Sequence, residues 1–268
     1  MGAIWSGLGD ILRAIIEFFY GLTNSYGLSI VLLTLLVRII LYPLNHKQLV
    51  SMQAMQKIQP RLKVIQEKYA DDKQKMTEET MRLYQENKVN PAAGCLPLLV
   101  QLPVLILLFN ILRTYDFTGA ATFFGITLGS STTAGLAQAV GVEALENGTY
   151  SLFAVLLGIL KNPMGLGQVS LYLPNLILLL TIAFLTWAQS NLSSGSNPQM
   201  STMNTIMPVF MGFICLSMPG GVMIYWGLST LVGVAQQYYV TQKAKDELSV
   251  KPVLHKNKPG KTEDEDAE

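Results

Sequence analysis

The sequence predicts an all-α polytopic membrane protein with five transmembrane helices. Half of the 268 residues are apolar and only 14% are charged, whereas soluble domains carry roughly 25% charged residues. The mean hydropathy is +0.35. Several long runs are nearly free of charge, and roughly 20 such residues are needed to cross about 30 Å of hydrocarbon. These observations argue against a water-soluble domain, and the segments are justified below in chain order.

Residues 1–24 are predicted to form an amphipathic helix that lies at the membrane interface. Seven apolar residues share one helical face: Ile4, Leu8, Ile11, Leu12, Ile15, Ile16 and Phe19. Charged residues occupy the opposite face: Asp10, Arg13 and Glu17. An apolar face opposed to a charged face is typical of a helix that lies along a bilayer surface.

Charge-poor runs define the five predicted spans, and a polar segment separates the first two. The spans are residues 25–44, 93–113, 171–190, 203–218 and, after a Pro-Gly-Gly turn, 219–240. In residues 45–92 apolar side chains recur every three or four positions, which predicts a cytoplasmic helical hairpin. Pro60 is expected to kink or interrupt its first arm, because proline lacks the backbone donor that a helix needs.

The distribution of basic residues predicts the orientation. Of the 19 Lys and Arg residues, nine lie in residues 45–92 and six in the charged tail 241–268. The long connection 114–170 has only one. The positive-inside rule therefore places the hairpin, the loop 191–202 and the C-terminal tail in the cytoplasm, and the N-terminus and the 114–170 loop outside. The tail, rich in charge, is expected to be disordered.

Arg38 is the single charge within the first predicted span, and the predicted spans contain no Asp or Glu. A guanidinium among lipid tails is costly and usually faces a polar cavity or a partner. Polar side chains that could meet it are Thr34, Gln101, Asn110 and Gln189. Two interpretations remain: Arg38 snorkels toward the cytoplasmic interface, or it lines an aqueous cavity that attracts acidic groups of a transient guest.

Three segments together resemble the motifs of the YidC membrane protein insertase family. They are Leu35–Leu44 (LLVRIILYPL), Asn90–Pro103 (NPAAGCLPLLVQLP) and Pro219–Thr230 (PGGVMIYWGLST), the last followed by Gln236 and Gln237. They occur in the family's order, with the basic hairpin between the first two. The resemblance covers roughly residues 5–245 and is weakest in 114–170.

The resemblance implies a five-helix bundle around a hydrophilic groove that is open to the cytoplasm and to lipid. Arg38 matches the groove arginine, and Gln189 and Trp226 match other groove positions. A client would place a short polar tail in the groove and slide its apolar part along the third and fifth spans. The groove would thereby lower the cost of moving polar groups through hydrocarbon. No cofactor, metal or nucleotide is expected.

The resemblance also implies location and partners. The absence of a large outer domain, of an early lipobox cysteine and of a transit peptide favours a short bacterial form in the cell membrane. The expected partners are nascent membrane proteins, lipid, the Sec translocon and the ribosome; DNA is not expected. Four basic residues of the hairpin could contact such partners or form a solvated face: Lys57, Arg61, Lys63 and Lys68.

Two other function classes are less consistent with the residues. An intramembrane hydrolase needs a nucleophile with its base, or metal ligands. The only histidines, His46 and His255, lie outside the predicted spans, and H-E-x-x-H and G-x-S-x-G motifs are absent. A small-solute secondary transporter is the alternative that the interrupted helices and the buried charge suggest. The lack of a visible repeat and of membrane carboxylates argues against it.

Overall fold

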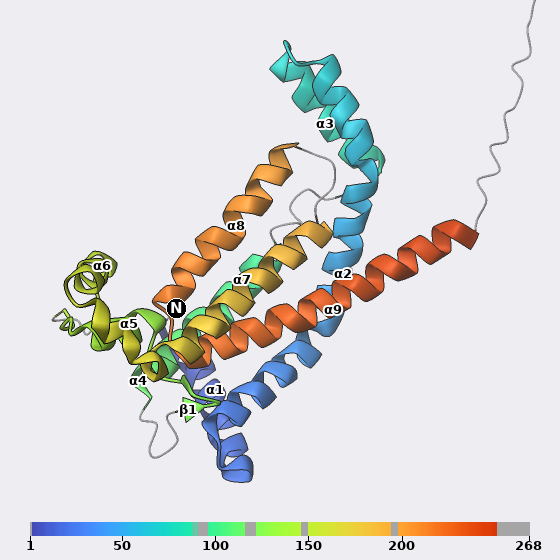
Figure 1. Ribbon diagram of the computed structural model, residues 1–268. Coiled ribbons are helices and arrows are strands. Elements are labelled where there is room, and N and C mark those ends of the chain that lie inside the picture. Colours follow the sequence, from blue (N-terminus) through green and yellow to red (C-terminus); the bar gives the residue numbers. More distant parts are fainter. Residues whose placement is uncertain are drawn as a thin grey trace, which may run out of the picture.

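The chain is described from a computed structural model that covers residues 2–87, 89, 96–115, 122–145, 150–193 and 198–250. This part of the chain is mainly helical (Figure 1). The α-helices are α1 (Gly2–Thr23), α2 (Tyr26–Lys68), α3 (Lys73–Glu86), α4 (Leu96–Thr114), α5 (Thr132–Val140), α6 (Leu152–Lys161), α7 (Leu173–Ser193), α8 (Pro198–Leu216) and α9 (Gly220–Val250). The short elements are strands β1 (Thr122–Phe123) and β2 (Ile126–Thr127) and the 3₁₀ helices η2 (Pro163–Gly167) and η3 (Val169–Leu171).

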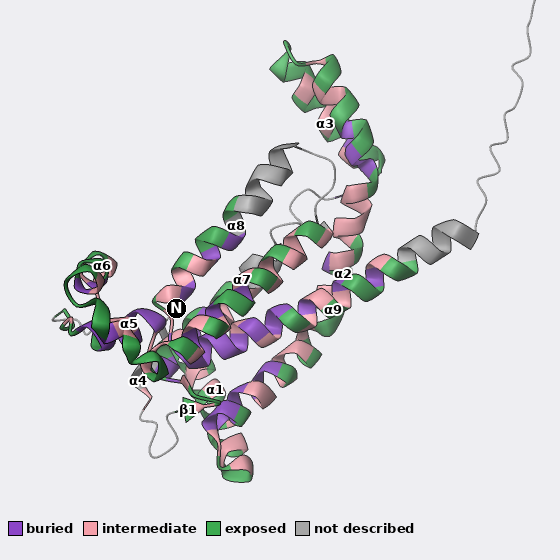
Figure 2. Ribbon diagram, viewed as in Figure 1, coloured by how far each residue is buried: buried purple, intermediate pink, exposed green. Residues whose placement is uncertain are grey.

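A bundle of long helices forms the body of the molecule. Helix α7 packs against α8 and α9, and α2 packs along α9. Buried residues gather along the first half of α9 (Figure 2). One apolar core joins α1, α2, α4 and α9 around Ile30, Leu108 and Tyr225, and a second joins α7, α8 and α9 around Ile182 and Cys215. The packing of α2, α7 and α9 against one another therefore fixes the positions of the side chains that lie between these three helices.

Helix α1 packs against α2 and α4, and its apolar residues divide between two environments. Ile16 is buried, and Leu12 and Ile15 pack against the bundle core. Phe18 and Leu22 are 63% and 67% exposed. An apolar surface exposed beside a packed stripe is consistent with a helix at the edge of the bilayer.

Helix α2 joins the first predicted span to the first arm of the hairpin without a break. The Ser25 hydroxyl caps its start by accepting a hydrogen bond from the Leu28 amide. The helix remains continuous through Pro43 and Pro60, so the expected interruption at Pro60 is absent. The helix instead changes direction about half-way along its length (Figure 1). Both prolines are exposed, and the helix runs through them although proline lacks a backbone donor.

The hairpin consists of the end of α2 and the antiparallel helix α3. The Asp72 carboxylate caps α3 by accepting a hydrogen bond from the Lys75 amide at 3.0 Å. A separate apolar core joins the two arms: Ile58, Leu62, Leu83 and Val89. This apolar core and the capping of α3 by Asp72 explain why so polar a segment is folded rather than extended.

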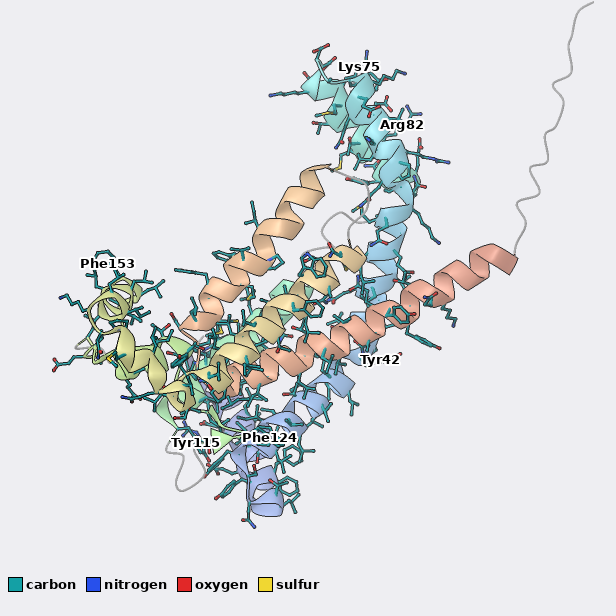
Figure 3. The ribbon with its side chains drawn as sticks, in the orientation of Figure 1. Tyr42, Lys75, Arg82, Tyr115, Phe124 and Phe153 are labelled. Atoms are coloured by element: carbon teal, nitrogen blue, oxygen red, sulfur yellow. The ribbon has the colours of Figure 1, made fainter. Side chains whose placement is uncertain are left out.

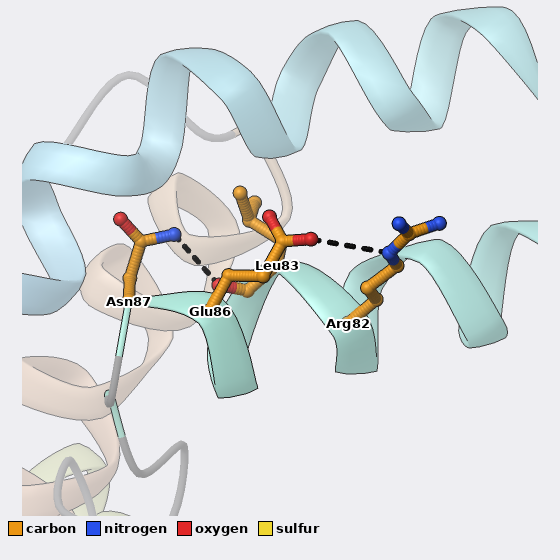
Figure 4. Close-up of polar contacts among 4 residues, drawn as sticks. All are labelled: Arg82, Leu83, Glu86 and Asn87. Carbon is orange, nitrogen blue, oxygen red and sulfur yellow. Dashed lines mark hydrogen bonds and ion pairs between the residues drawn. The ribbon is translucent and has the colours of Figure 1, made fainter.

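Exposed polar contacts on α3 contribute little to the stability of the hairpin. Arg82 Nε and Glu86 Oε1 lie 3.1 Å apart, and the Asn87 amide donates to the Leu83 oxygen at 2.7 Å (Figure 4). We expect Arg82→Ala to lower the free energy of unfolding by less than about 1 kcal/mol, because solvent and salt screen an exposed pair. Thermal unfolding at low and high salt would measure this. A loss of several kcal/mol would contradict the expectation.

Residues 114–170, expected to be a loop, contain an ordered unit that we call the cap (described residues 122–145 and 150–171). The Gly220 and Gly221 amides at the start of α9 donate to the Ser130 and Leu128 oxygens at 3.0 and 2.9 Å. Asn175 on α7, 2% exposed, accepts from the Thr127 amide and donates to the Ser130 oxygen. These contacts fix the cap to the ends of α7 and α9.

Within the described residues, two helices are long and apolar enough to cross a membrane: α2 and the Leu173–Leu192 part of α7. The apolar run of α9 is diluted by Ser229, Thr230 and Gln237, which are buried against neighbouring helices. The expected disordered tail is helical as far as Val250, and the rest of the tail lies outside the described residues.

Candidate functional site

Arg38 is half-buried on α2, where this helix packs along α9. Its Nη2 atom donates a hydrogen bond to the backbone oxygen of Ser229. Its Nε atom is buried and has no hydrogen-bond partner among the described residues. Both ion pairs among the described residues lie in the hairpin, so neither involves Arg38. The guanidinium therefore retains the capacity to donate to an acceptor that another molecule supplies.

The side chains of Arg38 and Gln189 both lie close to Gly233 on α9. A Cβ atom at Gly233 would lie 3.3 Å from Gln189 Nε2, and 3.6 and 3.8 Å from Arg38 Nη2 and Nη1. Gln189 extends from α7 and Arg38 from α2, so three helices meet at this glycine. We call Arg38, Gln189, Ser229 and Gly233 the Arg38 cluster.

A second polar contact joins α4 to α9 beside this cluster. Gln101 Nε2 donates a hydrogen bond to the Tyr225 hydroxyl at 2.8 Å. Tyr225 is 1% exposed and precedes Ser229 of the cluster by four residues, about one helical turn on α9. Gln101 is therefore linked to the cluster through Tyr225.

The Gln101–Tyr225 contact predicts a measurable loss for Tyr225→Phe. Removing the hydroxyl leaves a half-buried amide without this acceptor, so the free energy of unfolding should fall by about 1 kcal/mol. Thermal unfolding of the purified protein in detergent would measure the change. Tyr238→Phe is the control, because Tyr238 is 57% exposed. Equal losses for both variants would show that the hydroxyl of the buried Tyr225 contributes no more to the free energy of unfolding than the hydroxyl of an exposed tyrosine.

The other two predicted polar partners, Thr34 and Asn110, could only accept a hydrogen bond from Arg38, because a guanidinium has donors and no acceptor. Thr34 is fully buried, and its hydroxyl donates to the Ile30 oxygen of its own helix at 2.6 Å. Asn110 is exposed and lies nine residues after Gln101. Nine residues are two and a half helical turns, so the two side chains lie on opposite sides of α4. We therefore leave Asn110 out of the site.

Trp226 provides a second buried donor on α9. Its side chain packs against both cores, and its Nε1 atom has no hydrogen-bond partner among the described residues. It precedes Gly233 by seven residues, which is two turns, or about 10 Å, along the same side of the helix. A buried donor of this kind can bind an acceptor that another molecule supplies.

Two cavities lie on either side of the cluster. One, of about 240 Å³, lies between α2 and α9, and one, of about 310 Å³, lies between the cap and the bundle. The first is lined by Tyr42, His46, Leu49, Ala235, Gln236, Tyr239 and Val240. Arg38 lines neither cavity, so the expected groove is not one of these two spaces.

The four cations singled out on the hairpin are all exposed, but they do not form one face. Lys57, Arg61 and Lys68 share a side of α2, since their spacing of four and seven residues returns to nearly the same direction. Lys63 points about 140° away from that side, and its Nζ is 4.0 Å from Glu67. Lys68 Nζ lies 5.2 Å from the centre of the Tyr69 ring.

Sequence reasoning missed Ser229, Gly233 and Tyr225 as parts of the site. The Ser229 contribution is a backbone oxygen, which side-chain patterns do not reveal. Gly233 has no side chain to single out, and Tyr225 sits within a motif from which only Trp226 was selected. Of the described residues, none form a group of three or more His, Cys, Asp or Glu side chains that could hold a metal ion.

Comparison with known proteins identifies the family. The sequence pattern of the family described as 60Kd inner membrane protein matches residues 18–247. A membrane protein insertase YidC from Fusobacterium nucleatum is 34% identical over 238 residues, which are 87% of this chain and 97% of the relative. The chain belongs to the YidC family. The resemblance carried by the three motifs is thereby confirmed.

Other YidC proteins are longer than this chain. A YidC insertase of Nitratidesulfovibrio vulgaris is 33% identical over 90% of the chain, which spans 40% of that relative. A solved structure of an active YidC insertase, with its first transmembrane domain resolved, superimposes with a TM-score of 0.60 at 29% identity. That match covers 88% of this chain and 46% of the solved one. The helical architecture is therefore that of the YidC family.

Proposed function

We propose that the chain is a membrane protein insertase in which the Arg38 cluster receives the polar segment of an incoming client. The five spans would be the first part of α2, then α4, α7, α8 and α9, with the hairpin and the C-terminal tail in the cytoplasm. The location would be the bacterial cell membrane, and family membership supports insertion as the activity.

The observation that carries this proposal is the meeting of Arg38 and Gln189 at Gly233. A client's polar tail loses its hydration on entering the bilayer, and each unpaired polar group then costs several kcal/mol. Arg38 Nε and Trp226 Nε1 are buried donors with no partner in the described chain. Carboxylate or carbonyl oxygens of the tail could accept from them, which reduces the cost of entry.

The outer surface of α7 supports a path for the client's apolar part. Four large apolar residues on one side of this helix are each more than half exposed: Ile177, Leu180, Phe184 and Trp187. Their spacing of three and four residues forms a continuous stripe. A client helix that leaves the cluster along this stripe would remain in contact with lipid, and burial of its apolar surface would drive release without a nucleotide.

The hairpin supports a further role in meeting partners at the cytoplasmic side. Its side formed by Lys57, Arg61 and Lys68 would attract anionic lipid headgroups, acidic surfaces of the Sec translocon or ribosomal phosphates. Removing the three charges should weaken such contacts more at low salt than at high salt.

Reconstitution tests the proposed function against the small-solute transporter. Proteoliposomes of the full chain would receive a single-span client with a short acidic N-tail, and protection of that tail from protease would score insertion. Flux of small solutes would be measured in the same vesicles. We expect insertion without solute flux. Flux without insertion would overturn the proposal and favour the transporter.

A further inference from the structure

Helix α6 carries an apolar face that nothing in the described chain covers. Phe153, Leu156, Leu157 and Leu160 are 71%, 53%, 39% and 78% exposed. Met164, directly after the helix, is 90% exposed. Spacings of three and four residues place these side chains on one side of α6. A cluster of five large apolar side chains requires an occupant, whereas single exposed ones do not.

The opposite side of α6 is fixed to the protein. Val155 and Gly158 are its buried residues, and they lie half a turn from the exposed face. A Cβ at Gly158 would lie 2.6 and 2.8 Å from side-chain atoms of Val142 and Val140. The cap therefore presents the apolar face in a definite direction.

The position of α6 identifies what covers this face. The cap is bonded to the first turns of α7 and α9, so α6 lies at the level where these helices begin. Figure 1 shows α6 beside the bundle, beyond α8, rather than on the bundle axis. In Figure 3, Phe153 points away from the rest of the molecule. If the bundle spans the bilayer as proposed above, lipid surrounds it at this level and to this side.

We propose that α6 is a second interfacial helix, which inserts Phe153, Leu156, Leu157, Leu160 and Met164 into the outer leaflet beside α8. At 10 residues it is too short to cross the bilayer. The depth expected for an apolar face at the interface is about 5–10 Å below the headgroups. Lys161, the last residue of the helix, is exposed and can reach the phosphates. The helix would hold the cap at a fixed depth in the outer leaflet.

Depth-dependent fluorescence quenching tests this placement in the full chain. A single cysteine would replace Leu160 in a background with Cys95→Ser and Cys215→Ala, and it would carry an environment-sensitive fluorophore in phosphatidylglycerol–phosphatidylethanolamine nanodiscs. Quenching by nitroxides on the acyl chains would be compared with quenching by aqueous iodide. The same measurement with Phe153→Cys shows whether the result at Leu160 holds at a second position of the apolar face.

Two control positions separate this inference from the proposed function. Gln138→Cys, an exposed position on the largely buried helix α5, reports a polar part of the cap, and Leu180→Cys, 59% exposed on α7, reports the bundle. We expect the ratio of nitroxide to iodide quenching at Leu160 to exceed that at Gln138 severalfold and to approach that at Leu180. If Leu180 is quenched by lipid and Leu160 by iodide, α6 faces water and the inference is overturned. Protection of Leu160 from both quenchers would also overturn it, in favour of a contact between two copies of the chain.

Discussion

Replacing Arg38 with alanine should reduce insertion of a client with an acidic N-tail roughly ten- to a hundredfold. A hydrogen bond to a charged group contributes about 1.5–3 kcal/mol, and each 1.4 kcal/mol corresponds to a factor of ten. Arg38 also donates to the Ser229 oxygen, so the change affects the contact of α2 with α9. The rate at which the tail becomes protected in proteoliposomes would measure the effect.

Arg38→Lys is the matched variant, because it retains the charge without the planar arrangement of donors. We expect it to insert the client at a rate much closer to that of the unmodified chain. Circular dichroism and thermal unfolding of both variants would show whether the bundle is intact. Insertion by Arg38→Ala at the unmodified rate would assign Arg38 a purely structural or snorkelling role.

Gly220→Ala should destabilise the junction between the cap and the bundle more than any other substitution discussed above. A Cβ at Gly220 would lie 2.2 Å from the backbone oxygen of Thr127 and 2.8 Å from Ile126 Cγ2. The Thr127 backbone is held by Asn175, so it cannot yield cheaply. Overpacking of this kind costs about 2–3 kcal/mol, and the melting temperature should fall by roughly 5–10 °C.

Gly212→Ala is the control for this glycine, because a Cβ there meets nothing within 4 Å. Alanine is also favoured over glycine inside a helix by up to about 1 kcal/mol. Thermal unfolding in detergent should therefore show Gly212→Ala to be neutral or slightly stabilising. A similar fall in melting temperature for both variants would mean that the junction is not the cause.

Periodic and charge-based features could be predicted because they depend on local sequence. The pattern in residues 45–92 predicted a helical hairpin, and the structure has the end of α2, then α3 from Lys73. The family followed from three motifs, which a relative with 34% identity confirms. Arg38 was singled out for one reason, namely that a charge among lipid tails is energetically costly.

Features that arise from contacts between distant segments could not be predicted. The cap was expected to be a loop, since its helices are short and its order depends on Asn175 and the start of α9. The side of α4 that faces α9 is set by packing, so Gln101 contacts Tyr225 and Asn110 does not lie with it.

The most direct test of the central claim is a double-mutant cycle between Arg38 and the client's tail. Insertion rates would be measured for the unmodified chain and Arg38→Ala, each with a client whose tail carries carboxylates or the corresponding amides. If Arg38 attracts the tail, the alanine substitution should slow the acidic client about tenfold more than the amide client, a coupling of about 1.4 kcal/mol. Equal slowing of both clients would contradict direct recognition of the tail by Arg38.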